Sequence, residues 1–358
     1  MLKKLKNKYP RLRYIFDRGI WYILTLFVAI TINFFLPRLG VSPVDIIMGK
    51  VGSGLSTEAA KEKEEAYLKE FHLVKLNKNG EILRDKQGKP IKSSLLKQYI
   101  NYLCMTLRGD LGTSFLNYPK KVSAIVAEAL PWTLAIQFPT IVLGWIIGNL
   151  LGALAAYRRG VLDKVFYPLS LLATSIPFFA FGMLLVYQFA IVWTFFPPTG
   201  GYDIGLVPSF SWEFISSAAY YYTLPFLSIF PVMVGGMAIG MRSMGIYELG
   251  TDYIKYAQWL GIKESKIVMY IFRNAMLPQL AGLALQLGVM IGGALITEMI
   301  FSYPGLGTAL LNAVQANDYP VIQGGALLVA ITVLIANFSV DILIGLFDPR
   351  VKAGLEVG

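Results

Sequence analysis

The sequence predicts an all-α membrane protein with six transmembrane helices, and three observations support this prediction. Apolar residues make up 55% of the 358 positions, and the mean hydropathy is +0.57. Charged residues make up only 15%, whereas soluble globular proteins carry roughly 25%. The chain therefore has too few charged side chains to cover a water-facing surface. The 6 Trp, 20 Tyr, 22 Phe and 34 Gly suit close-packed membrane helices with aromatic residues at the interfaces.

The same composition excludes several kinds of functional site. The single cysteine, Cys104, excludes an internal disulfide framework and a multi-cysteine metal site. The single histidine, His72, excludes a two-histidine metal site. No G-x-x-x-x-G-K-[ST] segment occurs, so the chain has no P-loop of its own. The net charge of +10 is concentrated in a short N-terminal run, which favours a topological signal over nucleic-acid binding.

Six apolar segments are long enough to cross a hydrocarbon core of about 30 Å as helices. They are residues 21–36, 132–157, 168–196, 224–241, 280–301 and 323–347. The first is short, and its flanking Arg18 and Arg38 are expected to reach the interface by snorkelling. Pro177 predicts a kink in the third.

The distribution of Lys and Arg predicts the orientation. Basic residues cluster in segment 1–20 and in the connections after the second and fourth spans, whereas segments 197–222 and 302–322 contain none. By the positive-inside rule, both termini, including the tail 348–358, lie in the cytoplasm of a multi-pass protein of the cell (inner) membrane.

Residues 37–131 then form an extracytoplasmic loop subdomain, a small α+β insertion between the first two helices. Ser56 or Thr57 is expected to cap a charged helix. Asn79-Gly80 predicts a type I′ hairpin near 73–92. No internal repeat is evident in the chain. The charges here suit a solvated face, and a contact surface for a partner is the alternative.

Glycines recur at four-residue spacing in the apolar segments, which lets helix backbones approach closely in lipid. The steps are Gly144, Gly148 and Gly152, then Gly236 with Gly240, and Gly288 with Gly292. Packing within the chain is the favoured interpretation, and a subunit seam or a moving pore wall is the alternative.

The cytoplasmic loop 244–277 is too long for a simple helix hairpin. Asp252 is expected to cap a short helix that Gly261 ends, and a second amphipathic helix runs from Glu264 towards Pro278. The apolar positions of the first helix share one broad side: Ile254, Ala257, Trp259 and Leu260. Two short helices at an angle predict a lever that docks into a soluble partner.

This loop carries a resemblance to a known family. Asp252-Tyr-Ile-x-x-Ala257-x-x-x-Gly261, with Arg273-Asn-Ala-x-Leu-Pro278, resembles the oligopeptide/dipeptide permeases of ATP-binding cassette (ABC) importers. Further matching segments are Gln98-Tyr-x-x-Tyr102-Leu, Gly109-Asp-Leu-Gly-x-Ser114, Leu130-Pro-x-Thr-Leu134, Thr297-Glu-x-Ile-Phe301-x-x-Pro304-Gly-Leu-Gly307, Asp318-Tyr-Pro, Gln323-Gly and Asp348-Pro-Arg350.

The resemblance covers about residues 95 to 352, and the long first external loop resembles the B-type permease of the pair. The sequence departs from the family's pattern at Gly40-Val-Ser-Pro43-Val-Asp45, in the hairpin around Asn79, and at Lys255 and Tyr256.

The resemblance implies a type I ABC importer permease fold with a permease core at 132–347. It also implies a heterodimer with a second permease, two cytoplasmic ATPases that bind ATP and Mg, and an external substrate-binding protein. This chain would hold no cofactor, metal or catalytic residue. The cargo would be oligopeptides or dipeptides, or oligosaccharides such as cello-oligosaccharides.

The expected ATPase-coupling residues are Asp252, Tyr253, Lys255, Ala257, Trp259, Leu260, Gly261 and Pro278. The small residues would let the short helix lie flush in a partner's groove, and Trp259 and Leu260 would supply apolar contact. The alternative is that the loop lies on lipid headgroups.

Polar residues at membrane depth are candidates for function. The pore or gate candidates are Gln188, Gln286, Glu298, Pro304 and Asn337. Interhelical hydrogen bonding explains the amides equally well. Glu298 is expected near the external mouth, as a group for gating or substrate contact, as a hydrated group, or as a cap for neighbouring backbone. Asp341 is expected to form a structural pair within the bundle.

Two other function classes remain. A self-contained secondary transporter or channel would need inverted repeats or an intramembrane ion relay, and neither is evident. An intramembrane enzyme would need paired acidic residues, but Glu298 and Asp341 are expected near opposite faces.

Overall fold

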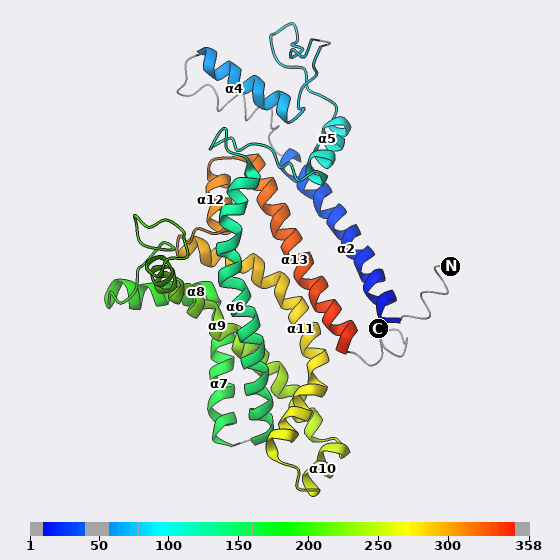
Figure 1. The fold of residues 1–358 in the computed structure, drawn as a ribbon, viewed down its shortest axis with the longest axis vertical. Helices are drawn as coiled ribbons and strands as arrows, with labels where there is room; N and C mark the ends of the chain where they lie inside the picture. The colour runs from blue at the N-terminus through cyan, green and yellow to red at the C-terminus, as the bar shows by residue number, and fades with distance from the viewer. Residues whose placement is uncertain (1–9, 40–56, 78, 159, 348–358) are drawn as a thin grey trace. The chain divides into compact units, whose positions relative to one another are not determined.

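The computed structural model describes residues 10–39, 57–77, 79–158 and 160–347, and these are overwhelmingly helical (Figure 1). β structure among the described residues is limited to isolated bridges, as at Val74↔Lys92 and Thr113↔Lys121. The chain divides into two compact units. One comprises Met1–Tyr22, Leu130–Thr308 and Thr332–Gly358, and the other Ile23–Ala129 and Ala309–Ile331.

The second unit is held together by polar contacts among three helices: α2 (Pro10–Phe35), α5 (Leu95–Leu107) and α13 (Tyr319–Phe347). The Asn33 side-chain amide donates to the Gln323 carbonyl at 2.8 Å, and the Gln323 amide donates back to the Asn33 carbonyl at 3.0 Å. The same Asn33 amide donates to the Tyr102 hydroxyl. Reciprocal amide bonds of this kind fix the register of two helices.

The expected charged helix is α4 (Thr57–Glu70); Ser56, one of its two predicted caps, lies outside the described residues. The turn after it differs from the prediction. A type I′ turn at Asn79-Gly80 would join the strands through those two residues alone, whereas here the Gly80 N–H, with φ 79° at Gly80, donates to the Asn77 carbonyl at 3.2 Å. The loop instead closes by the Asn77 N–H donating to the Glu81 carbonyl at 2.9 Å.

Segments 74–81 (VKLNKNGE) and 82–89 (ILRDKQGK) are identical at two positions only, but their local hydrogen bonds match. The Asn77 N–H donates to the Glu81 carbonyl, and the Asp85 N–H donates to the Lys89 carbonyl. Lys75 donates to the Ile91 carbonyl, Ile91 to Leu83, and Leu83 to Lys75, each at 2.8 to 2.9 Å. These three hydrogen bonds close the segments into a small triangle of extended backbone. A search for longer repeats does not detect units this short.

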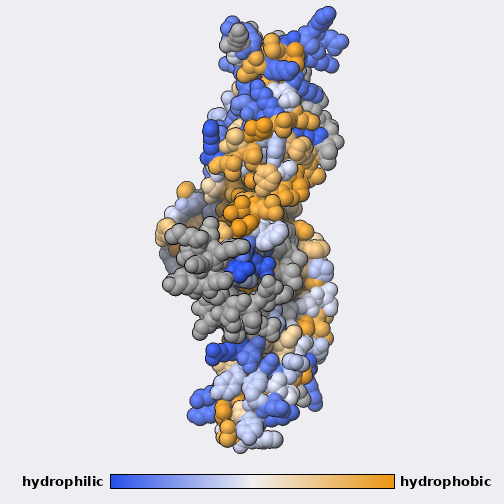
Figure 2. Space-filling model, turned by 90° about the vertical axis from the view of Figure 1, so that its right-hand side faces the viewer, coloured by the Kyte–Doolittle hydropathy of each residue, from blue (hydrophilic) through white to orange (hydrophobic). Residues whose placement is uncertain are grey.

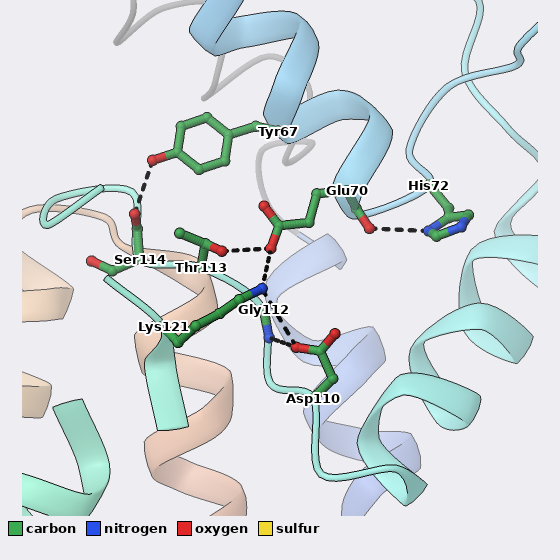
Figure 3. A network of polar contacts seen from close by, with 8 residues as sticks. All are labelled: Tyr67, Glu70, His72, Asp110, Gly112, Thr113, Ser114 and Lys121. Atoms are coloured by element: carbon green, nitrogen blue, oxygen red, sulfur yellow. Dashed lines mark hydrogen bonds and ion pairs between the residues drawn. The ribbon is translucent and has the colours of Figure 1, made fainter. Parts of the chain in front are cut away.

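A polar network fastens α4 to the loop 110–121 (Figure 3). The Glu70 carboxylate accepts hydrogen bonds from the Thr113 hydroxyl at 2.5 Å and from Lys121 at 3.1 Å. The Tyr67 hydroxyl donates to the Ser114 carbonyl at 2.8 Å, and burial raises the pKa of this hydroxyl. The subdomain therefore has its own polar anchor as well as an apolar cluster of Tyr67, Leu68, Leu73 and Val74.

The first unit is built around α9 (Trp212–Leu249), against which α6 (Val122–Arg158), α7 (Val161–Ser175) and α11 (Glu264–Ile300) pack. Glycines on α6 make the α6–α9 packing possible. A Cβ atom on Gly148 would lie 2.6 Å from the Val234 carbonyl oxygen and 2.7 Å from the Met237 Cβ. Gly144 and Gly152 are similarly close to α9. This confirms the interpretation of these three glycines as packing within the chain.

Within the described ranges, four helices are long and apolar enough to cross a membrane, or up to six if each of two bent helix pairs counts as one span. One pair is Asp163–Ser175 with Phe178–Val192, bent by 95° at Ile176 and Pro177. The kink predicted at Pro177 is confirmed, but it is far sharper than a bend within one helix. Ile176 adopts extended backbone, so α7 ends there. The chain then continues as α8 (Phe178–Leu185) and the π-helix η2 (Val186–Val192). The other pair bends by 50° near Pro278.

The first predicted span lies within α2, whose side chains are largely uncovered. Apolar residues with exposed side chains recur along it: Leu12, Phe16, Ile20, Trp21, Ile23, Leu24, Phe27, Val28, Ile32 and Phe35. Figure 2 shows hydrophobic side chains gathered in the upper half of the face turned towards the viewer. A surface of this kind is stable only against lipid or another protein.

Asp341 forms the structural pair that the sequence predicts. Its carboxylate accepts a hydrogen bond from the Tyr22 hydroxyl at 2.9 Å and lies 3.8 Å from the Arg18 guanidinium. Arg18 therefore pairs with α13, where the sequence predicted snorkelling to the interface. The pair joins the first and last long helices.

Candidate functional site

The first candidate site is the elbow formed by α10 (Asp252–Trp259) between α9 and α11. Ile254 is fully buried and Ala257 is 6% exposed, and both pack in one apolar cluster with Met241, Ile267 and Ile271. The elbow is therefore supported from beneath by the ends of α9 and α11. It is a fixed shape, not a loose connection.

Hydrogen bonds hold the elbow at its start. The Tyr253 hydroxyl donates to the Glu248 carboxylate on α9 and accepts from the Asn274 amide on α11. Burial, followed by the hydrogen bond to Glu248, raises the pKa of Tyr253. The expected capping by Asp252 is not found: the N-cap position is Thr251, and Asp252 instead pairs with Lys255 at 3.3 Å.

Gly261 ends α10, as the sequence predicts. Its φ is 67°, its N–H donates to the Gln258 carbonyl, and the Ile262 N–H donates to the Ala257 carbonyl. This is the left-handed helix stop for which glycine is favoured. An added Cβ at Gly261 would meet nothing within 4 Å, so the position requires glycine for its backbone conformation and not for space.

The outer side of the elbow carries four exposed side chains, which we call the α10 surface: Tyr247, Tyr256, Trp259 and Leu260. Trp259 is 79% and Leu260 71% exposed. The Tyr256 and Trp259 rings lie 5.9 Å apart. Exposed aromatic and aliphatic side chains on a rigid base are typical of a protein-binding anchor.

Two of the expected coupling residues are placed differently from the prediction. Ala257 faces the chain's own core, so its small side chain permits internal packing and does not line an outer groove. Pro278 does not end the second helix: α11 continues through it to Ile300. From Glu264 to Pro278 the helix rises about 21 Å, so Pro278 is remote from the α10 surface along α11.

The second candidate site surrounds Glu298, which is 1% exposed near the end of α11. The Gly307 N–H donates to its carboxyl group at 2.6 Å, and the Leu306 N–H donates to the Thr133 hydroxyl at 2.9 Å. These are the first amides of α12 (Leu306–Gln315), which no helical carbonyl can satisfy. Glu298 and Thr133 therefore begin α12, in an arrangement that we call the Glu298 latch.

Glycine makes the latch compact. A Cβ atom on Gly305 would collide with the Glu298 carboxyl group, and one on Gly307 would lie 2.7 Å from the Leu295 Cα. Pro304 is half-buried and packs against Gly201. Glu298 is thus buried, so the hydrated carboxyl is wrong, whereas the alternative that Glu298 caps neighbouring backbone is confirmed.

The remaining pore candidates are not brought together. Gln188 lies half-buried in η2, where its carbonyl accepts from the Trp193 N–H. Asn337 lies half-buried on α13. Gln286 belongs to α11, but its side chain lies outside the described part of the structure.

Sequence reasoning missed other buried polar residues of the long helices. Asn149 is fully buried, and its amide donates to the Trp145 carbonyl at 2.7 Å. Gln279 is 7% exposed and contacts Gly240. Each is a polar residue in an otherwise apolar run, which is the signal that would have found it.

A bidentate ion pair was also missed. Arg242 on α9 donates to both oxygens of Asp163 on α7, at 2.5 and 2.8 Å, and its guanidinium lies 4.1 Å from the centre of the Tyr167 ring. The pair fixes the end of α7 to α9.

Comparisons with known proteins agree with this arrangement. Residues 148–353 match the family described as binding-protein-dependent transport system inner membrane component. The chain is 32% identical over 278 residues to the dipeptide transport system permease protein of Escherichia coli K12, covering 72% of this chain and 80% of that protein. It is 32% identical to the di/tripeptide transport system permease protein of Pseudomonas aeruginosa, covering 72% and 81%. It is 31% identical to the glutathione transport system permease protein of Salmonella choleraesuis, covering 71% and 79%.

Proposed function

This chain belongs to the family of binding-protein-dependent transport system inner membrane components, and from that premise we propose that it is one of two permease subunits of an ATP-driven importer of small peptides. It is a multi-pass protein of the inner membrane and the permease component of such a system. The relatives are named for dipeptides, di- and tripeptides and glutathione, which favours peptides over oligosaccharides as cargo.

The observation that carries this proposal is the α10 surface. An importer whose membrane subunit has no nucleotide site must receive mechanical work from separate ATPases. A rigid, internally packed elbow with Trp259 and Leu260 exposed suits that transmission, because force on the surface reaches α9 and α11 together. A loop that only rests on headgroups would need no such backing.

The remaining parts of the proposal follow from the fold. We take each bent helix pair as one span, which gives six. The basic connections support an orientation with the α10 surface and both termini in the cytoplasm. A second permease, two ATPases that bind ATP and Mg, and an external binding protein complete the assembly. The Glu298 latch then lies towards the external side, where it holds α12 as part of a gate.

The experiment is co-expression of the chain with its partner permease and ATPases, followed by reconstitution. The double variant W259A/L260A removes two exposed anchors and no buried contact. We expect it to lose most co-purifying ATPase and at least about tenfold of the peptide-stimulated ATPase activity, since anchor residues contribute about 2 kcal/mol or more.

The matched control is Val161→Ala, which removes a side chain that is 78% exposed at the start of α7. It should leave both readouts unchanged. Transport by the chain alone, without a nucleotide-binding partner, would refute the proposal and return attention to a secondary transporter.

A further inference from the structure

A cavity of about 580 Å³ is lined by none of the residues of the α10 surface or the Glu298 latch. Its walls come from the segment before α6, the first turns of α6, the face of α12 beyond Thr308, and the start of α13. All of its lining residues belong to the second compact unit. A volume of this size lies in the range of small-molecule sites, which is roughly 300–1,000 Å³.

One wall is preorganised by Asp318, which is 1% exposed. Its carboxylate accepts hydrogen bonds from the Ser114 hydroxyl at 2.5 Å and from the Phe115 and Leu116 N–H groups at 3.0 and 2.9 Å. These neutral donors occupy acceptor positions of the carboxylate and fix its direction, but they do not cancel its charge. Among the lining residues there is no Lys or Arg, so the cavity offers a ligand no basic group.

Three amide side chains line the cavity: Asn117 before α6, and Asn312 and Gln315 on α12. Asn117, Asn312 and Gln315 are exposed, and none has a side-chain hydrogen bond to another residue in the described parts of the chain. A primary amide offers two donor hydrogens and an acceptor oxygen, the complement of a peptide group. Their chemistry suits neutral amides more than carboxylates or ammonium groups.

The floor between the amides is formed by small side chains. Ala309, Ala313 and Ala316 line the cavity from α12 at spacings of four and three residues, which places them on one face of the helix. With only methyl groups there, an extended backbone can approach α12 closely enough for Asn312 and Gln315 to reach its peptide groups.

We propose that this cavity is a transient binding site for the backbone of the transported peptide, recognising interior peptide groups without regard to side chains or terminal charges. The inference rests on the proposed function and deepens it, because it assigns a contact for the cargo on this subunit. It predicts that a peptide blocked at both ends binds as well as a free one.

The test uses the whole importer, with partner permease and ATPases, in nanodiscs without nucleotide or binding protein. The probe is N-acetyl-alanyl-(p-benzoylphenylalanyl)-alanine amide, a blocked tripeptide carrying a photoreactive ring. After irradiation, mass spectrometry maps the labelled residues. We expect labelling within 116–125 and 309–321, competed by excess N-acetyl-trialanine amide and not by cellotriose.

The decisive variant is N312L/Q315L, which removes two exposed amides and keeps α12 intact. Two lost hydrogen bonds should reduce labelling by about tenfold or more. Asn117→Leu, on the opposite wall, should reduce it independently. The control is Val314→Leu, since Val314 is exposed on α12 and does not line the cavity.

Labelling that is unchanged in N312L/Q315L and N117L, or that maps elsewhere, overturns the inference. Competition by cellotriose in place of the peptide overturns the peptide assignment. If the binding protein alone displaces the labelling, that protein occupies the cavity, and the inference is overturned as well. ATP-driven peptide uptake by the same complex in sealed proteoliposomes, with the binding protein added, tests the proposed function separately. Uptake without labelling of this cavity refutes only the inference, whereas absence of uptake refutes the function.

Discussion

Replacing Asp318 with alanine should release the loop 113–117 from the start of α13. The carboxylate is 1% exposed and holds the Ser114 hydroxyl and the Phe115 and Leu116 amides at 2.5 to 3.0 Å. The distance of 3.5 Å between the Val321 amide nitrogen and the Asp318 carboxylate is too long to count as a full hydrogen bond. The substitution leaves these donors without an acceptor in a buried site.

The magnitude follows from these contacts. Hydrogen bonds to a charged group contribute about 1.5–3 kcal/mol each, so three nominally supply about 4.5–9 kcal/mol. Burying the carboxylate costs several kcal/mol, and we expect a net loss of about 3 kcal/mol in the local stability of the loop. That corresponds to about a 100-fold increase in the population of the open loop.

Hydrogen exchange with mass spectrometry, on the protein in nanodiscs, measures this opening directly. Peptides covering 112–122 should exchange about 100-fold faster in Asp318→Ala than in the wild type. Asp85→Ala is the matched control, because Asp85 also accepts two backbone amides at 2.9 Å but is exposed. Its effect should stay below about threefold, as for most surface substitutions.

Exchange in Asp318→Ala within threefold of the wild-type rate would show that the carboxylate does not hold the loop. The reasoning from buried, charge-assisted hydrogen bonds would then be wrong. Peptides in α10 serve as an internal reference, since their exchange should not change.

Three further substitutions test the rest of the fold. Glu298→Ala removes the acceptor for the Gly307 amide of α12 and should cost about 1–3 kcal/mol locally, seen as faster exchange in α12, whereas Glu298→Gln keeps an acceptor and should cost less. Gly148→Val places side-chain atoms where α9 backbone lies and should abolish a monodisperse detergent-solubilised protein. Gly282→Ala, with nothing within 4 Å of its added Cβ, should leave that elution profile unchanged. Arg242→Gln breaks a bidentate pair whose side chains are only 22% and 15% exposed, and should lower the Tm of the purified protein by an amount equivalent to about 2 kcal/mol. The double variant with Asp163→Asn should recover part of this loss. A Tm equal to that of the wild type in Arg242→Gln would refute the assignment of the ion pair.

The helical class of the protein was predictable because it depends on composition and on runs of residues. Apolar stretches of about 20 residues report the membrane directly, and Pro177 reports a break because proline lacks the amide that a helix interior needs. Gly261 was predicted to stop α10 for an equally local reason, and its φ of 67° confirms it.

The candidate sites were predictable only in part, because a residue's type does not tell which way it faces. Ala257 looked like an outward-facing small residue and is buried, while Trp259 beside it is exposed. Glu298 was expected to be hydrated or to cap neighbouring backbone, and only the structure shows that it is buried and begins α12 from another helix. Both outcomes depend on contacts with residues distant in sequence.

The sequence by itself determined that this chain is a helical membrane protein, where its principal breaks fall, and which family it resembles, because hydropathy, proline and glycine act through their immediate neighbours. Only the tertiary structure decided that Gly148 lies against α9, that Asp318 organises the loop before α6, and that three free amides line one cavity. Those relations join segments up to about 200 positions apart, and no local pattern specifies them, since burial and hydrogen-bond partners exist only once the chain has folded.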